Sequence, residues 1–171
     1  MKSLGVINQN DFEPQDYFDR KTVRAVILNE DNSKVLFFGN HFVGGGVEEN
    51  ETDEEALHRE AMEEAGATIE IIRPIGKVIA YRDAIKKKYV VHGYLCKQVG
   101  PLVKPTTTQP DEINATIRWL GLQEAIDLYI ETIEKIHKEH GLPLTDDIAQ
   151  SRSHNCSASL MILQEAVKSL Q

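Results

Sequence analysis

The segment from residue 44 to residue 66 constrains the fold more than any other part of the sequence, because glycines frame a glutamate-rich helix. Three consecutive glycines, Gly44 to Gly46, open the segment. The run from Thr52 to Glu55 then matches a capping box, in which the Thr52 hydroxyl accepts the amide hydrogen of Glu55. We therefore expect a helix that begins there and ends at Ala65, with Gly66 in the left-handed position that stops it.

Three glutamates of this helix are predicted to share one face. Each helical residue advances about 100°, so Glu60, Glu63 and Glu64 fall within an arc of roughly 100°. The adjoining arc holds apolar side chains that we expect to border the core, namely Leu57, Ala61 and Ala65. Like charges at this spacing destabilise a helix by roughly 0.2–0.5 kcal/mol per pair, and by more when they lose water. Arg59 is the one neighbouring base and cannot neutralise all three. The pattern therefore fits either a bound cation or an ordinary solvated glutamate-rich helix, and the adjacent glycines favour the cation. Hard oxygen donors without His or Cys favour Mg²⁺ or Mn²⁺ over zinc.

The net charge of the chain is concentrated in the same segment. The 171 residues include 27 Asp and Glu against 19 Lys and Arg, which gives a formal charge of −8. Between Glu48 and Glu64 there are nine acids and a single base, so this stretch carries the whole excess and the rest of the chain is formally neutral. An acidic balance argues against nucleic acid or an anionic membrane as the main partner.

Length and composition favour one compact domain. Domains typically hold roughly 100–200 residues, and a chain with 41% hydrophobic and 27% charged residues is neither disordered nor fibrous. Cys96 and Cys156 are too few and too distant in sequence for a disulfide framework or a paired metal motif, so we expect a reducing compartment. We find neither a sustained apolar leader core nor an apolar run of membrane length. We therefore predict a soluble, cytoplasmic protein.

Patterns elsewhere in the sequence predict a sheet. Strands are expected over residues 21–29, 34–38, 68–72, 77–82, 89–98 and 116–120, with 83–88 as a connection and 101–110 as a long loop. Helical patterning runs from Leu122 to about Ile136, and a last amphipathic helix is indicated by Leu160, Leu163, Val167 and Leu170. Strands interleaved with helices favour an α/β fold in which helices cover a mixed sheet.

The glycines, the acids and the arginine together match a known motif. Read from Gly45, the sequence is Gly45-x5-Glu51-x7-Arg59-Glu60-Ala61-x-Glu63-Glu64-x-Gly66-Ala67, which resembles the Nudix box, G-x5-E-x7-R-E-U-x-E-E-x-G-U with U a bulky aliphatic residue. Every polar and glycine position matches. Ala61 and Ala67 depart from the two U positions, and Val43 stands where a proline often precedes the glycines. These departures thin the local packing but leave the chemistry intact.

The resemblance implies a Nudix-type α/β/α sandwich with a mixed β-sheet. We expect residues 1–171 to form a single domain of this kind, with residues 1–20 as an N-terminal arm and residues 141–171 as a C-terminal helical extension. The role of the extension is open between packing, capping of the substrate site and subunit contact.

The same resemblance implies a hydrolase that cleaves the diphosphate linkage of a nucleoside diphosphate derivative by attack of water on phosphorus. A diphosphate is anionic and repels hydroxide, so metal ions must bridge its oxygens and lower the pKa of water. The metal ligands of the family correspond to Glu60, Glu63 and Glu64, and the Gly44 carbonyl can add an oxygen. We therefore expect Mg²⁺, with Mn²⁺ as an alternative. Glu60 is the predicted catalytic base within the box.

Further site residues follow from their positions relative to the box. Arg59 is expected to orient a neighbouring glutamate with Glu51 as its partner; the alternative is a surface ion pair that contributes about 0–1 kcal/mol. The backbone at Gly45 and Gly46 can approach a phosphate closely. Family members often supply another acid from the loop before a late strand, where Glu112 stands. Glu112 is therefore a candidate extra ligand or base, or else a solvated turn carboxylate.

Two strand arginines and one histidine complete the candidates. Arg24 and Arg82 lie on predicted strands and are assigned to contacts with the phosphates or the base of the substrate. His92 lies among apolar and aromatic residues, so we interpret it as a core or cleft histidine and not as a ligand.

The sequence lacks most of the signatures that distinguish individual Nudix subfamilies. The proline that marks ADP-ribose pyrophosphatases downstream of the box has no counterpart, and the stretch before the glycines lacks the coenzyme A pyrophosphatase signature. By elimination, we expect a nucleoside triphosphate or a related nucleotide as the small-molecule partner, hydrolysed to the monophosphate. A homodimer is compatible with the sequence. The alternatives are a catalytically silent nucleotide-sensing module, an ADP-ribose or nucleotide-sugar pyrophosphatase, and an isomerase acting on a diphosphate.

Overall fold

The computed structural model describes residues 1–9, 15–107 and 115–170. In this part of the chain, strands form one six-stranded sheet in the order β1-β4-β5-β2-β3-β6. Their bounds are β1 (Ser3–Ile7), β2 (Phe18–Leu28), β3 (Lys34–Phe38), β4 (Ile69–Arg82), β5 (Lys87–Gln98) and β6 (Ile117–Gly121). β1 runs parallel to β4 and β2 runs parallel to β5, whereas the other neighbours are antiparallel. The sheet is mixed, as predicted.

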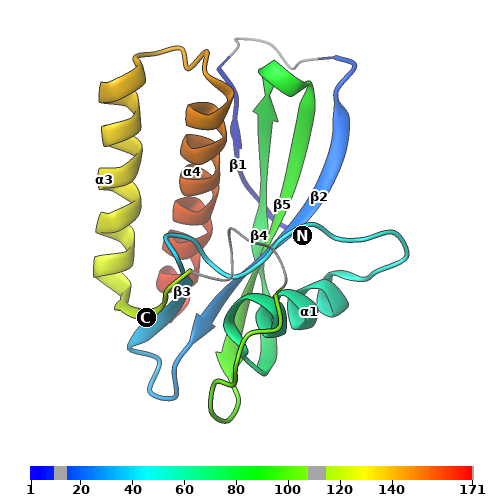
Figure 1. Ribbon diagram of the computed structural model, residues 1–171, viewed down its shortest axis with the longest axis vertical. Helices are drawn as coiled ribbons and strands as arrows, with labels where there is room; N and C mark the ends of the chain where they lie inside the picture. Colours follow the sequence, from blue (N-terminus) through cyan, green and yellow to red (C-terminus); the bar gives the residue numbers. More distant parts are fainter. Residues whose placement is uncertain (10–14, 108–114, 171) are drawn as a thin grey trace.

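Helices cover both faces of the sheet (Figure 1). α1 (Asp53–Ala65) lies on one face, and α3 (Leu122–His140) and α4 (Asp147–Lys168) lie side by side on the other. The predicted α/β/α sandwich is therefore confirmed. None of the helices in the described residues combines the length and the apolar character that a membrane span needs.

Alternation along β2 divides its side chains between two cores. Val23, Ala25 and Ile27 are fully buried and pack with α1. Val26 and Leu28 are also fully buried, but they point to the opposite face and pack with α3 and α4. Successive side chains of a strand point to opposite faces, and each large apolar side chain so buried stabilises the fold by roughly 1.5–3 kcal/mol. β2 therefore anchors both helical layers.

The helix α1 begins and ends where the sequence predicts. The Thr52 hydroxyl accepts a hydrogen bond from the Glu55 amide at 3.2 Å, and the Glu55 carboxylate accepts one from the Thr52 amide at 2.8 Å. Gly66 stops the helix with a φ of 58°. A Cβ at Gly66 would also lie 1.9 Å from the Val103 carbonyl oxygen, so glycine is required for space as well as for conformation.

Two predicted strands, 68–72 and 77–82, are one strand in the structure. The register of β4 against β5 shifts near Arg73 and again near Gly76, with Pro74 between the two shifts. Such irregularities accommodate a proline, which has no N–H to donate. β4 then leads into β5 through the short helix η1 (Asp83–Ile85). β1, within the N-terminal arm, has no counterpart among the predicted strands, because this short edge strand is only partly buried and lacks a clear apolar alternation.

The segment from Val43 to Gly46, called the glycine segment below, lies along the part of the β2 edge that β3 leaves unpaired. β3 pairs with β2 only between Val35 and Leu28, and otherwise with β6. The freed part of β2 pairs with the segment that follows β3, through Ala25 with Val43 and Thr22 with Gly46. This pairing fixes the three glycines against the sheet, next to α1.

Candidate active site

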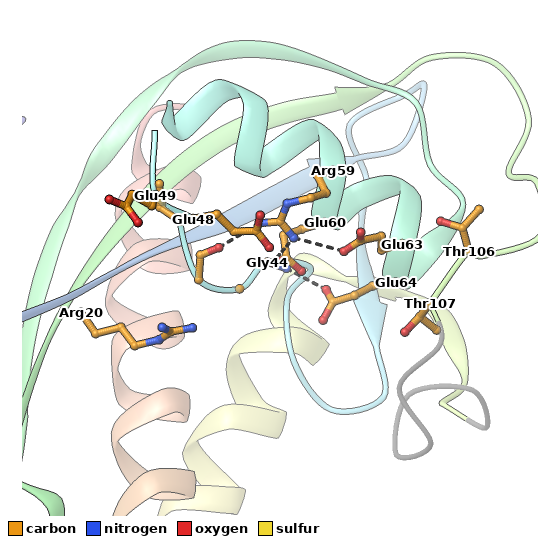
Figure 2. A pocket seen from close by; sticks show the side chains of 13 residues that line it. Arg20, Gly44, Glu48, Glu49, Arg59, Glu60, Glu63, Glu64, Thr106 and Thr107 are labelled. Carbon is orange, nitrogen blue, oxygen red and sulfur yellow. Dashed lines mark hydrogen bonds and ion pairs between the residues drawn. The ribbon is translucent and has the colours of Figure 1, made fainter. Parts of the chain in front are cut away.

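The glycine segment and α1 border a pocket of about 770 Å³ (Figure 2). Its acidic wall consists of glutamates from α1 and from the segment that precedes it, namely Glu48, Glu49, Glu60, Glu63 and Glu64. Arg20 from β2 and Arg59 from α1 contribute the positive charges, and Thr106 and Thr107 lie beyond the glutamates. Five carboxylates against two guanidiniums leave a formal negative excess in this pocket.

Arg59 lies at the centre of the carboxylates. Its Nε and Nη2 donate to the two oxygens of Glu51, at 2.8 and 3.0 Å, which is a bidentate ion pair. Its Nη1 donates to Glu60 at 2.8 Å and to Glu63 at 3.1 Å. Nη2 also donates to the Gly46 carbonyl at 2.9 Å, so this one side chain links α1 to the glycine segment. Hydrogen bonding to Glu51 raises the pKa of Arg59 despite burial, and the same contact holds the pKa of Glu51 below its usual value.

Glu64 connects α1 to the glycine segment by a second route. The Gly44 amide donates to Glu64 Oε2 at 2.8 Å, and the Glu64 side chain is almost fully buried. Gly44 has a φ of 140°, and a Cβ there would lie 2.2 Å from the Val23 carbonyl oxygen. Only glycine allows this approach, so the first glycine of the run is required by both conformation and space.

Glu60 lies directly beneath Gly45. A Cβ on Gly45 would lie 2.3 Å from Glu60 Oε1, so the missing side chain is what gives the carboxylate its place. Burial raises the pKa of Glu60, and this effect outweighs the opposing influence of Arg59. The carboxyl group is therefore a better proton acceptor than an exposed glutamate, provided that it is ionised.

The donor set of the pocket suits a hard divalent cation by its chemistry. It offers carboxylate and backbone carbonyl oxygens, which are the ligands that Mg²⁺ prefers. In the described part of the chain, no three Asp, Glu, His or Cys side chains are grouped as a metal ion would require. Glu60 and Glu63 instead contact Arg59, and Glu64 contacts the Gly44 amide. The predicted ligands are thus neighbours in one pocket but are held by protein partners.

The sequence was compared with models of protein families, and the model described as the NUDIX domain matches residues 19–140. The chain belongs to the Nudix family. This match confirms the resemblance noted in the sequence and the expectation of a hydrolase. Nudix hydrolases act on small nucleotide substrates.

Solved structures of the same fold agree with this assignment. The MutT protein from Methanosarcina mazei Go1 is 18% identical and matches with a TM-score of 0.54, over 92% of this chain and 100% of that chain. The E. coli ORF135 protein is 20% identical and matches with a TM-score of 0.53, over 91% of this chain and 97% of that chain. At these identities the likeness concerns the fold alone. A comparison with curated protein sequences gave no significant match.

Several predicted residues of the Nudix site lie together, whereas Arg82 lies apart from them. Glu60, Glu63, Glu64 and Arg59 line the pocket with Gly44, Gly45 and Gly46, and Glu51 holds Arg59. Arg82 does not line the pocket, because its guanidinium donates to Asp147 at 2.6 Å and to the Tyr89 hydroxyl at 3.1 Å, beside the start of α4. Glu112 lies outside the described residues.

Arg24 reaches the Nudix glycines from β2. Its Nη1 donates to the Gly44 carbonyl, the oxygen that the sequence assigns to the metal, and to the Val23 carbonyl at 3.1 Å. Arg20, which the sequence did not single out, lines the pocket beside Gly46, where a Cβ would lie 2.3 Å from its Nη2. A charged residue near a strand end gives no signal of this role until the pairing of the glycine segment with β2 is known.

A second polar cluster in the Nudix box surrounds Asp53, for which the sequence offered no role. His92 Nδ1 and the Tyr94 hydroxyl both lie 2.7 Å from Asp53 Oδ2, and Lys21 Nζ lies 2.5 Å from Oδ1. Burial opposes the ionisation of Asp53, but these three partners outweigh it and hold its pKa below the ordinary value. His92 is thus a partly buried histidine that binds a carboxylate, in agreement with its interpretation as a core or cleft residue.

Proposed function

We propose that this Nudix hydrolase cleaves the diphosphate linkage of a nucleoside triphosphate or a related nucleotide and releases the nucleoside monophosphate. The observation that carries the proposal is the pocket in which five glutamates border the glycine segment. A nucleotide polyphosphate is itself anionic, so it would enter such a pocket only together with cations. The excess of carboxylates is therefore an argument for metal-dependent chemistry on a phosphorylated substrate.

Mg²⁺ is the proposed cofactor, with Mn²⁺ as a substitute. Glu60, Glu63 and Glu64 would hold it, together with the Gly44 carbonyl. When bound, the metal supplies charge neutralisation on the diphosphate oxygens and a more acidic water. Glu60 and Glu63 would exchange Arg59 for the metal, while Arg59 keeps its bidentate contact with Glu51 and its bond to the Gly46 carbonyl.

Glu60 is the proposed general base. Its carboxylate lies against Gly45 and lines the pocket that the proposed substrate would enter. The raised pKa of Glu60 brings it closer to the value that a proton acceptor needs. Glu112 remains a candidate for a further ligand or base.

Arg20 and the glycines are proposed to bind the phosphates that are not coordinated by the metal. Arg20 lies across the pocket from Glu60, Glu63 and Glu64 (Figure 2), and the structure gives it no ion pair with another described residue. A guanidinium suits a phosphate because its paired N–H groups match two phosphate oxygens. Arg24 would act indirectly, by holding the Gly44 carbonyl in place.

The whole chain is proposed to act as one domain with a small-molecule nucleotide as its partner. β1, in the N-terminal arm, pairs with β4 of the central sheet, and α4, in the C-terminal extension, packs against the same sheet. Both segments therefore pack on the sheet that carries the pocket.

A substrate screen tests the proposal. Purified protein is incubated with nucleoside triphosphates, ADP-ribose, nucleotide sugars and dinucleoside polyphosphates, first with Mg²⁺ and then with Mn²⁺, and the products are identified. We expect release of a nucleoside monophosphate from a triphosphate, lost in the Glu63→Gln variant and kept in Glu54→Gln, which alters an exposed glutamate of the same helix. Faster cleavage of ADP-ribose or a nucleotide sugar would replace the proposed substrate class. Binding without turnover across the whole panel would indicate a nucleotide-sensing module.

A further inference from the structure

The sheet ends at β6, and the outer edge of this strand is open in the described part of the chain. β6 is last in the strand order and pairs on one side with β3. The Gly39 amide donates to the Thr116 carbonyl at 2.8 Å, which makes these two residues a hydrogen-bonded pair of the ladder. Such pairs alternate along antiparallel strands, so Ile117 and Trp119 direct their N–H and C=O groups away from β3. Phe38, which lies opposite Ile117, accordingly bonds to the turn that follows it. The edge thus offers backbone donors and acceptors to an added strand.

A groove of about 420 Å³ lies between β6 and α3, and we call it the α3 groove. Its apolar part consists of Leu120 of β6 and Leu128 of α3. Its acidic part consists of Glu124, Asp127 and Glu131, which are exposed and recur at intervals of three and four residues along one face of α3. Successive side chains of a strand point to opposite faces, so every second side chain of a strand added to β6 would point into this groove.

The one base that lines the α3 groove among the described residues is Arg118. Its Nη2 donates to the Gly39 carbonyl at 2.9 Å and to the Asn40 side-chain oxygen at 3.0 Å. Neither of these acceptors belongs to the groove lining. Arg118 is therefore held by the turn after β3 and not by the carboxylates of α3.

The carboxylates of the α3 groove keep their negative charge. Glu124 accepts from the Gly121 amide at 3.1 Å, and Asp127 accepts from the Gln123 carboxamide at 2.8 Å. Among the described residues, no ion pair includes either of these acids or Glu131. Neutral donors orient a carboxylate but leave its charge in place. Three carboxylates against one guanidinium leave a formal excess of negative charge, which a cationic occupant complements.

The charge of the α3 groove opposes pairing with a second copy of this chain. Pairing of β6 with the same strand of another copy about a two-fold axis would place the same acidic side chains on both sides of the contact. Each copy would bring three groove carboxylates and one guanidinium, so like charges would face one another. A strand with basic side chains removes this conflict. The groove therefore favours a segment of another protein.

We propose that the open edge of β6 and the α3 groove bind an extended, basic segment of another protein, which adds a strand to the sheet. The backbone of this segment pairs with Ile117 and Trp119. Its lysine or arginine side chains enter the α3 groove, where their aliphatic stems cover the two leucines and their charged ends reach the carboxylates. Its other side chains are apolar, because Ile117 and Trp119 are half-buried against the core on the α1 face of the sheet. The partner segment therefore alternates basic and apolar residues. This inference does not depend on the substrate of the hydrolase.

Fluorescence of Trp119, the single tryptophan of the chain, tests the proposal at the edge itself. The probe is a peptide of alternating lysine and valine, about eight residues long, which is within the usual length of a strand. We expect the peptide to shift the emission of Trp119 and to bind more weakly as the salt concentration rises. A peptide of alternating glutamate and valine should not bind. The lysine–valine peptide with every backbone nitrogen methylated keeps its charges but loses its donors, so its Kd should be at least about tenfold higher.

A charge reversal tests the acidic part of the α3 groove. In Glu131→Lys, we expect the Kd of the lysine–valine peptide to rise roughly tenfold, with thermal unfolding close to wild type because Glu131 is exposed. Glu139→Lys makes the same change of net charge at an exposed position of α3 outside the groove, so it is the matched control and should bind like wild type.

Three results would overturn the inference. Equal binding of the methylated peptide would mean that charge alone attracts the probe, without pairing to β6. Equal Kd values in Glu131→Lys and Glu139→Lys, or an unchanged emission of Trp119, would remove the probe from the groove. Sedimentation that shows a dimer which the peptide dissociates would assign the edge to a second copy of this chain.

Discussion

At the N-terminal end of α1 a single carboxylate, Asp53, faces three partners. In the last two turns, Glu60 and Glu63 share the guanidinium of Arg59, and Glu64 accepts the Gly44 amide hydrogen. Asp53 contacts Lys21, His92 and Tyr94 at 2.5–2.7 Å. Glu60 and Glu63 both contact Arg59, which also forms a bidentate ion pair with Glu51. We refer to these regions as the Asp53 cluster and the Arg59 cluster.

The helix dipole increases the contrast between the two clusters. Acids in the first turn of a helix are stabilised by the amide groups there, and acids near its C-terminus are destabilised, each by typically about 0.3–1 kcal/mol. The last turn of α1 has no basic residue to offset its glutamates. The comparison teaches that the protein itself neutralises the Asp53 cluster, which therefore serves the fold. The Arg59 cluster retains an excess of negative charge, which suits the cation of the proposed function.

The largest expected effect is on the chemistry of the Arg59 cluster. Glu64→Gln should lower kcat/KM for the best nucleotide roughly 10²–10³-fold, because a neutral amide replaces a carboxylate of the proposed metal site. The glutamine oxygen can still accept the Gly44 amide hydrogen, so thermal unfolding should stay close to wild type. Glu54→Gln is the matched control. Retention of wild-type activity in Glu64→Gln would remove Glu64 from the proposed metal site.

Asp53→Asn should show the opposite result, with a loss of stability and little loss of activity. Asparagine keeps the shape of the side chain but leaves Lys21 without its counter-charge and gives His92 and Tyr94 a neutral partner in place of a carboxylate. We expect the free energy of unfolding to fall by about 1–3 kcal/mol, with kcat/KM changed less than about threefold. Urea unfolding and steady-state kinetics measure the two quantities. A large fall in activity at unchanged stability would place Asp53 in the active site and erase the distinction between the clusters.

Mg²⁺ should stabilise the folded protein through the Arg59 cluster only. At a metal concentration about ten times Kd, binding adds about 1.4 kcal/mol and raises the melting temperature by about 3–5 °C. The rise should be absent in Glu64→Gln and present in Asp53→Asn. Thermal unfolding with and without Mg²⁺ measures the rise in melting temperature. Protein in Ca²⁺-free buffer with a chelator gives the baseline. An equal rise in both variants would mean that the metal binds elsewhere.

The smallest expected effect is the pH dependence of the Asp53 cluster. The pKa of Asp53 lies below its ordinary value of 3.8, because its three partners outweigh the effect of burial. Its contribution to stability is therefore complete above that value and is lost as the pH falls through the lower pKa of the folded state. The stability difference between wild type and Asp53→Asn should narrow from about pH 5 towards about pH 3. A constant difference across this range would assign the effect to packing and not to ionisation.

The parts of the site that the sequence predicted are those within one short stretch of chain. The capping box at Thr52, the stop at Gly66 and the shared face of Glu60, Glu63 and Glu64 all depend on spacings of one to four residues along a helix. Such spacings are set by helical geometry, so they can be recognised without knowledge of the rest of the fold.

Contacts between residues on different elements could not be predicted from their spacing in the sequence. Arg82 and Arg24 are both strand arginines in the sequence, yet Arg82 contacts Asp147 of α4 and Arg24 contacts Gly44. Their different positions follow from the pairing of β2 with the glycine segment and from the length of β4, which continues past Pro74 as one strand. The same pairing brings Arg20 to the pocket.

By itself, the sequence determined that this chain contains a capped acidic helix behind three glycines, with more carboxylates than its own bases can neutralise. Only the tertiary structure decided that Asp53 is matched by Lys21, His92 and Tyr94, and that β6 at the edge of the sheet lies beside the acidic face of α3. The physical reason is that charge excess and helical periodicity are local properties of the chain. The partners of each charge instead depend on strand register and helix packing, which join residues far apart in sequence.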